Sequence, residues 1–185
     1  MLKKQSKNRI SRRAFLLLSA QCAASALVGI PVLSYAGRIP RQMLSFYHTH
    51  TGETLEIMLD AKNIGTQAVR QVSRFLRDFR TGETHPIDPH LLDLLCRIKK
   101  VSGSDGTIEV ISGYRSPATN EILRKKSGGV AKKSLHMQGR AIDIRLSNLQ
   151  TCKLKDIACS LKQGGVGYYA KSDFVHLDTG KIRYW

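Results

Sequence analysis

The sequence contains 185 residues, of which 42% are hydrophobic and 24% are charged; this length suits one domain, and the apolar content is sufficient for a buried core. Lysine and arginine total 30 against 14 aspartate and glutamate residues, so the formal net charge of +16 indicates an anionic partner. No C-x-x-C pair occurs among the four cysteines, which argues against a cysteine-ligated zinc site.

The first 36 residues predict a signal peptide. "MLKKQSKNRISRRAF" is basic and contains no acid, and the apolar run after it ends in the small-x-small pattern "SYA" at Ala36. Arg12 and Arg13, placed before Phe15 and Leu16, resemble a twin-arginine export signal, so we expect a periplasmic protein. The alternative is an uncleaved N-terminal anchor, although the apolar run is short for a membrane span.

Residues 37–185 form the expected single domain and remain strongly basic. Six of the 30 basic residues precede position 37 and no acid does, which leaves 24 basic and 14 acidic residues and a net charge of +10. Carboxylate-rich cell-wall polymers, lipid headgroups and nucleic acid would all be attracted to such a surface. Export makes nucleic acid the poorest of these partners, and no run of basic residues interleaved with aromatics supports it.

A β-hairpin is predicted first, in "LSFYHTHTGETLEIML", because apolar and polar residues alternate on both sides of Thr51-Gly52. His48 and His50 have strand spacing within it. A metal-binding pair is one interpretation, but we expect solvent-facing histidines near a turn.

Two scaffold helices follow the hairpin. "TQAVRQVSRFLRDFR" has apolar residues at helical spacing, namely Val69, Val72, Leu76 and Phe79. "DPHLLDLLCRIKKV" begins with a capping residue, Asp88, and with Pro89 at the first helical position.

A strand over residues 107–112 and a helix with Ser116 as cap and Pro117 at its first position come next. A third long helix is expected after Ser147 as its cap, ending at the Gly-Gly pair 164–165. Short strands and a turn complete the chain. The order predicts an α+β domain in which helices precede a small antiparallel sheet.

Cys96, Cys152 and Cys159 remain after the signal segment. Cys152 and Cys159 would lie on one helix face about two turns apart, too far to form a disulfide easily. We therefore expect three buried, small apolar side chains.

The stretch "SLHMQGRAIDIRL" places a histidine and an aspartate on either side of a glycine turn. Within it, Ile142 and Ile144 belong to the core face of a strand, so Asp143 faces the other way. A turn at Gly139 can fold His136 back over Asp143.

His176, in the apolar strand "DFVHLDTG", is the best candidate for a third ligand. A His/Asp/His set suits Zn²⁺ and leaves a fourth position open for water, as catalytic zinc sites require. A simple hydrogen-bonded His–Asp pair is the alternative, because two such residues seven positions apart are a weak motif.

"SLHMQGRAID" resembles the Ser-x-His-x-x-Gly-x-Ala-x-Asp signature of the zinc peptidases that include D-Ala-D-Ala dipeptidases and carboxypeptidases. These enzymes share a fold with hedgehog signalling domains. "HTGE", "ISGYRS", "GGVGYY" and "FVHLDTG", in this order, are similar to the exported group typified by murein endopeptidase K. The resemblance covers nearly all of residues 37–185 and implies a hedgehog/DD-peptidase-like fold with one Zn²⁺ per chain.

By position, the resemblance implies His136, Asp143 and His176 as zinc ligands and Arg115 as the group that stabilises the oxyanion of the attacked carbonyl. A fixed guanidinium beside zinc favours developing negative charge, which agrees with that role. Ser134 either orients the substrate or bonds the loop backbone. Three tyrosines are candidates for the groove lining, with packing as the alternative: Tyr114, Tyr168 and Tyr169.

Two aspartates are candidates for the general base. Many superfamily members place an acid three residues before the last zinc histidine, which is Asp173 here. In a regular strand Asp173 and His176 point to opposite faces, whereas Asp178 and His176 share one. We favour Asp173, brought round by a bend at residues 171–172, with Asp178 as the alternative base or as a partner that fixes the imidazole.

The sequence thus predicts an exported zinc endopeptidase acting on peptidoglycan peptides. The resemblance implies cleavage of cross-links, including bonds between two diaminopimelate residues. The alternatives are a D,D-carboxypeptidase or L-Ala-D-Glu peptidase of the same superfamily, a catalytically inactive wall-binding module, and a charge-driven binder of anionic polymers or nucleic acid.

Overall fold

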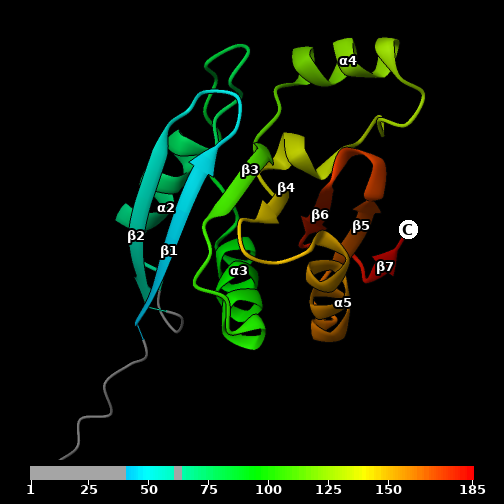
Figure 1. Ribbon diagram of the computed structural model, residues 1–185. Coiled ribbons are helices and arrows are strands. Elements are labelled where there is room, and N and C mark those ends of the chain that lie inside the picture. The colour runs from blue at the N-terminus through cyan, green and yellow to red at the C-terminus, as the bar shows by residue number, and fades with distance from the viewer. Residues whose placement is uncertain (1–40, 61–63) are drawn as a thin grey trace, which may run out of the picture. The chain divides into compact units, whose positions relative to one another are not determined.

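The computed structural model describes residues 41–60 and 64–185, so the predicted signal peptide and the alternative anchor lie outside the described residues. The strands are β1 (Arg41–His48), β2 (Thr54–Asp60), β3 (Ile108–Ser112), β4 (Ala141–Leu146), β5 (Gly165–Tyr169), β6 (Phe174–Asp178) and β7 (Arg183–Tyr184). The helices are α2 (Thr66–Phe75), α3 (Pro89–Ser102), α4 (Pro117–Lys126) and α5 (Thr151–Leu161), with 3₁₀ turns η1 (Leu135–Gln138) and η2 (Ala170–Ser172) (Figure 1). Within these ranges no helix is long and apolar enough to cross a membrane.

All seven strands form one mixed sheet in the order β2-β1-β3-β4-β6-β5-β7. The β1–β3 and β5–β7 pairs are parallel, and the other pairs are antiparallel. The α+β prediction is confirmed, but the expected small antiparallel sheet is wrong in size and in strand direction. The reason is that the N-terminal hairpin joins the same sheet, and a crossover through α2 and α3 makes β3 parallel to β1.

The hydrophobic core joins α2, α3 and α5 to the strands. Alternate residues of β4, Ile142 and Ile144, are fully buried in it, as the period of two predicts. Leu91 and Leu95 of α3 and Leu154 of α5 pack into the same cluster. The opposite face of β4 is therefore left free for polar groups, and Asp143 lies there.

The predicted helix starts at Asp88 and Ser116 are confirmed, since each side chain accepts a backbone N–H of its helix. Other boundaries differ. α2 ends at Phe75, short of Phe79, because the chain turns at Asp78, whose carboxylate accepts from the backbone N–H of Arg80. α5 starts after Gln150, because the Ser147 hydroxyl accepts from Thr107 N and does not cap the helix.

The hairpin is confirmed, but the expectation that both of its histidines face solvent is wrong. His48 is 1% exposed and packs edge-on against Phe75 and Phe79, so it belongs to the core. His50 is exposed and stacks on Phe79. The cysteine expectation holds for Cys96 and fails for Cys152, which is exposed on α5, and for Cys159, which is only partly buried.

Candidate metal centre

Three side chains from separate segments converge on one point. β4 and β6 are neighbouring antiparallel strands, and Asp143 of β4 is the register partner of His176 of β6. His136 comes from the 3₁₀ turn η1, which precedes β4. Asp143 Oδ1 lies 2.8 Å from His176 Nδ1 and 3.3 Å from His136 Nε2. The two histidine nitrogens are 3.2 Å apart. The predicted meeting of these distant residues is therefore present in the structure.

Local sequence explains how η1 presents His136. Ser134 caps the turn by accepting the backbone N–H of His136, at 3.3 Å. Gly139 ends the turn in the left-handed region with φ 64°, and a Cβ there would lie 2.2 Å from the carbonyl oxygen of Pro86. Only glycine fits such a position without movement of the neighbouring loop.

Hydrogen bonds fix the tautomer of each imidazole. His136 Nδ1 lies 2.8 Å from the carbonyl oxygen of Gly113, which can only accept, so Nδ1 carries the hydrogen and Nε2 offers its lone pair to the cluster. His176 Nε2 donates to Asp178 Oδ2 at 3.0 Å. His176 Nδ1 therefore faces Asp143 and the cluster.

Asp178 is a fully buried support for His176. Its exposed fraction is 0%, and Arg183 donates to both of its carboxylate oxygens, at 2.6 and 3.1 Å. The backbone N–H groups of Gly165 and Gly180 donate to Oδ1. The carboxylate thus has four donors besides the imidazole, which explains why it can stay ionised inside the protein.

The electrostatics of the cluster match a site that holds a cation. Burial raises the pKa of Asp143, but His136 and His176 outweigh burial and hold it well below its usual range. Burial lowers the pKa of His176, but hydrogen bonds and charge from Asp143 and Asp178 raise it to about 9. The protein thus places a positive charge at Nδ1 of His176, where a proton and a metal ion compete.

The donor set fits zinc. Two neutral imidazole nitrogens and one carboxylate oxygen are the borderline-hard ligands that Zn²⁺ takes in catalytic sites with an open position. The three residues form a group of potential metal ligands whose donor atoms lie within 4.8 Å of one another. A cavity of about 460 Å³ opens over them.

Arg115 lies beside the cluster, as predicted. Its Nη2 is 3.7 Å from Asp143 Oδ2, and its backbone N–H donates to the carbonyl of His136. The side chain lines the cavity and is only 12% exposed. A buried guanidinium in this place can face the oxygen of a bound carbonyl.

Asp173 does not reach the cavity, which corrects its predicted position. The residue is left-handed, with φ 50°, and its carboxylate accepts from Thr151 at 2.7 Å and lies 3.7 Å from Arg145. It lines a different surface hollow with those residues. The bend at Ala170–Ser172 therefore turns Asp173 away from His176, as strand parity indicates.

Two of the three candidate tyrosines lie outside the cavity. Tyr114 is 8% exposed and stacks on His85. Tyr168 points to the helix side of β5, near Lys155, because Gly167 and not Tyr168 is the register partner of His176. Tyr169 lines the cavity.

The sequence interpretation missed several cavity residues, among them Lys133, Phe174, Arg183 and Trp185. The Trp185 ring lies 5.3 Å from the His176 ring, and a Cβ on Gly167 would meet it at 2.5 Å. The indole N–H donates to the hydroxyl of Tyr169. The only sequence signal for this contact is the alternation of glycines in "GGVGYY", which indicates that another group packs closely on one face of β5.

A His/Asp/His centre with a buried arginine, on a mixed sheet covered by helices, defines a class of metal-dependent peptide hydrolases. Residues 36–185 match the model of the family described as peptidoglycan L,D-endopeptidase MepK. The chain belongs to this family, which confirms the resemblance noted in the sequence motifs.

Curated relatives cover nearly the whole chain. The peptidoglycan L,D-endopeptidase MepK of Escherichia coli (strain K12) is 35% identical over 176 residues, which span 95% of this chain and 97% of that protein. A protein of Haemophilus influenzae named probable peptidoglycan L,D-endopeptidase MepK is 38% identical over 178 residues, 95% of each chain.

Proposed function

We propose that this protein is a zinc endopeptidase that hydrolyses peptide cross-links of bacterial peptidoglycan, including bonds between two diaminopimelate residues. The observation that carries the proposal is the convergence of His136, Asp143 and His176 beside Arg115 in one cavity. The names of the relatives support both the reaction and the substrate.

His136, Asp143 and His176 would hold one zinc ion per chain, and a bound zinc ion supplies an acidified water and a Lewis acid for the scissile carbonyl. Asp178 keeps His176 in the tautomer that presents Nδ1. Arg115 offers its guanidinium to the oxyanion that develops on the carbonyl.

The cavity walls are suited to a carboxylate-rich peptide. Lys133 adds positive charge beside Arg115 and beside Arg183, which is paired with Asp178 behind the cavity, and Asp143 is the only acid among the described residues that line the cavity. Tyr169 and Phe174 stack on each other at 4.6 Å and form an aromatic wall with Trp185. Such a lining attracts D-Glu and diaminopimelate carboxylates and repels cationic peptides.

Neither Asp178 nor Asp173, the two aspartates that the sequence offered as general base, has that role in this proposal. Asp178 is enclosed behind His176 and is a positioning residue, and Asp173 is held at the surface by Thr151 and Arg145. Ser134 bonds the backbone of η1 and also borders the cavity.

Residues 1–36 support an exported, periplasmic enzyme, delivered by the twin-arginine route through a signal peptide ahead of a single domain at 37–185. In this location the partner is peptidoglycan and not nucleic acid, and membrane contact is limited to an uncleaved signal segment. Cell fractionation of wild type and of the Arg12→Lys/Arg13→Lys variant tests the route. The variant should stay in the cytoplasm.

Digestion of isolated peptidoglycan, followed by chromatography and mass analysis, tests the activity. We expect cross-linked fragments to decrease with wild type and to persist with His136→Ala or after chelation, while elemental analysis finds one zinc per wild-type chain. Release of terminal D-alanine alone would indicate a D,D-carboxypeptidase. Cleavage between L-Ala and D-Glu would indicate an L-Ala-D-Glu peptidase. Binding without any cleavage would leave a wall-binding module and overturn the proposal.

A further inference from the structure

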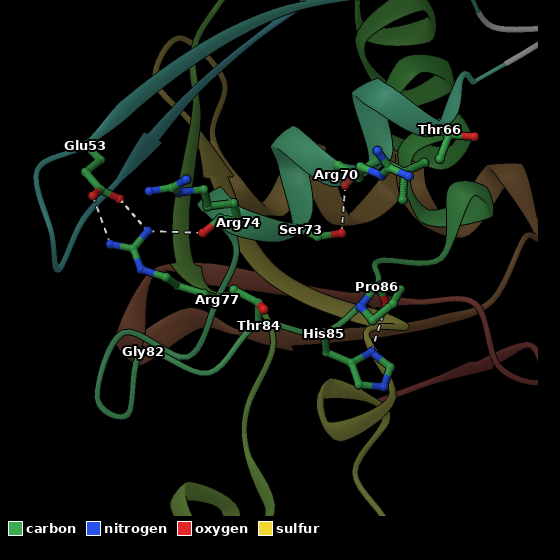
Figure 2. A pocket seen from close by; sticks show the side chains of 11 residues that line it. Glu53, Thr66, Arg70, Ser73, Arg74, Arg77, Gly82, Thr84, His85 and Pro86 are labelled. Carbon is green, nitrogen blue, oxygen red and sulfur yellow. Dashed lines mark hydrogen bonds and ion pairs between the residues drawn. The ribbon is translucent and has the colours of Figure 1, made fainter.

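A second cavity, larger than the one over the metal centre, lies between α2, the tip of the β1–β2 hairpin and the loop that follows α2 (Figure 2). Its volume is about 830 Å³, within the range of ligand-binding pockets. Its lining shares no residue with the metal cavity. The polar residues around it are Glu53, Thr66, Arg70, Ser73, Arg74, Arg77, Thr84 and His85.

The charge of this cavity is unbalanced. Arg70, Arg74 and Arg77 line it against a single acid, Glu53. Figure 2 shows Glu53 paired with Arg77, and both carboxylate oxygens accept from the guanidinium, each at 2.9 Å. Arg70 and Arg74 are exposed and have no acidic partner within residues 41–60 and 64–185. Two positive charges one helical turn apart therefore remain available to a ligand.

The guanidinium groups of the site suit a planar anion such as a carboxylate. A guanidinium binds carboxylate through two parallel N–H donors, and the Glu53–Arg77 pair displays this geometry on the cavity wall. Val69 and Pro86 add apolar surface, and the Thr84 hydroxyl adds a polar group. An ordinary solvated helix face would carry the same arginines on a convex surface, whereas here they border a hollow.

The loop with Thr84, His85 and Pro86, which lines this cavity, also contacts residues next to the metal centre. His85 stacks on Tyr114, the residue before Arg115, with ring centroids 5.0 Å apart. The Pro86 carbonyl packs against Gly139, which ends the turn that carries His136. One loop therefore lines the second cavity and also contacts the residues next to Arg115 and at the end of the turn that carries His136.

We propose that the Arg70/Arg74 cavity is an accessory binding site for the carboxylates of a second stem peptide of the same peptidoglycan polymer. The inference rests on the proposed function, because a cross-linked polymer carries further carboxylate-rich peptides next to the one being cut. The site anchors the polymer and takes no part in bond cleavage.

Binding of the purified protein to isolated sacculi in the presence of a chelator tests the inference, because no cleavage disturbs the measurement. Arg70→Gln/Arg74→Gln should weaken binding about fivefold, since two exposed charge contacts are lost. The matched control is Lys100→Gln/Lys153→Gln, which removes two positive charges from exposed positions of α3 and α5 outside both cavities. It should bind as wild type does.

A second variant is expected to bind more tightly than wild type, a result that misfolding cannot produce. Glu53→Gln should tighten binding, because it releases Arg77 for the ligand. On sacculi whose carboxylates have been amidated, the wild type and Arg70→Gln/Arg74→Gln should bind equally weakly. An unchanged Kd for the arginine variant, an equal loss in the lysine control or weaker binding by Glu53→Gln would each overturn the inference.

Failure of the inference and failure of the proposed function give different results. Cleavage of the same sacculi without chelator reports on the proposed function alone. If wild type cleaves while all variants bind equally, only the accessory site is refuted. If wild type binds through Arg70 and Arg74 but never cleaves, the endopeptidase proposal fails and the anionic site remains.

Discussion

At the scale of single residues, Asp178 decides which nitrogen of His176 faces the cluster. Its carboxylate accepts the Nε2 hydrogen, so Nδ1 is directed at Asp143. A hydrogen-bond partner of this kind both orients a ligand and fixes its tautomer. The metal affinity of the site thus depends on a residue that does not touch the metal-binding point.

We therefore expect Asp178→Ala to weaken zinc binding by about 10- to 100-fold. Competition with a chromophoric chelator measures the dissociation constant. Asp173→Ala serves as the matched control, since that side chain is 61% exposed and its carboxylate accepts a hydrogen bond from Thr151, and the change should alter zinc affinity less than about twofold. A greater loss of zinc affinity in Asp173→Ala than in Asp178→Ala would show that Asp173, and not Asp178, supports the metal site.

Zinc affinity should also rise with pH. Asp143 and Asp178 raise the pKa of His176 to about 9 in the metal-free protein, so below pH 9 a proton occupies the nitrogen that the metal requires. Each bound zinc then releases one proton, and affinity increases about tenfold per pH unit up to pH 9 and levels off above it. Calorimetric titrations in buffers of different ionisation enthalpy give the number of protons released. Affinity that is flat between pH 6 and 8 would contradict this prediction.

Arg115 is expected to act on the reaction and not on metal retention. Arg115→Ala should lower kcat/KM on peptidoglycan fragments by about 100-fold, the usual effect of removing one oxyanion donor. Zinc content per chain should stay near that of wild type, because Arg115 contacts Asp143 only at 3.7 Å. Loss of zinc together with activity would assign Arg115 a structural role.

At the scale of elements, the turn between η1 and β4 joins the metal centre to the loop that precedes α3. The carbonyl of Gly139 accepts the backbone N–H of Asp88, and the Pro86 carbonyl occupies the space that a side chain at position 139 would need. The position of His136 thus depends on a close contact between two backbones.

Gly139→Ala should destabilise the fold by about 1–3 kcal/mol, because alanine is strained at φ 64° and its Cβ collides with the Pro86 carbonyl. For a protein of this size the melting temperature should fall by about 2–4 °C per kcal/mol. Gly128→Ala is the control, since a Cβ there meets nothing within 4 Å and the residue has no positive φ. Equal melting temperatures for both variants would show that the turn tolerates a side chain.

Sequence patterns predicted the elements whose signals are local. Asp88-Pro89 and Ser116-Pro117 marked helix starts because a cap and a proline act within one turn. Alternation in β4 separated Ile142 and Ile144 from Asp143 correctly. Ser147 failed as a cap because its hydroxyl found a partner 40 residues away, at Thr107, which no local pattern reveals.

At the scale of the whole molecule, the convergence of His136, Asp143 and His176 could be predicted and its surroundings could not. His136 and Asp143 are close in sequence, but the pairing of β4 with β6 and the parallel alignment of β1 with β3 depend on long-range contacts. The side of β5 on which Tyr168 lies follows from its register against β6, and a shift of one residue exchanges the two faces. Arg183 comes from β7, a strand of two residues, and Trp185 directly follows it.

Metal removal should lower global stability, because the centre joins η1, β4 and β6. At free zinc about 1,000 times its dissociation constant, binding stabilises the folded protein by about 4 kcal/mol. Calorimetric scans before and after chelation should show a lower melting temperature for the metal-free protein, and re-addition of zinc should restore it. His136→Ala should show no shift on chelation, which makes it the control. An identical shift in that variant would place the stabilising ion elsewhere.

The potential metal ligands and part of the cavity wall come from different kinds of structure. Asp143 and His176 are hydrogen-bonded neighbours in the middle of the sheet, whereas part of the wall is supplied by the 127–133 loop and by Arg183 and Trp185 near the end of the chain. The loop part of the wall is thus separate from the strands that carry Asp143 and His176, whereas Arg183 is coupled to His176 through Asp178. Variation in that loop can change which peptides are accepted and leave the side chains that position His136, Asp143 and His176 unaltered.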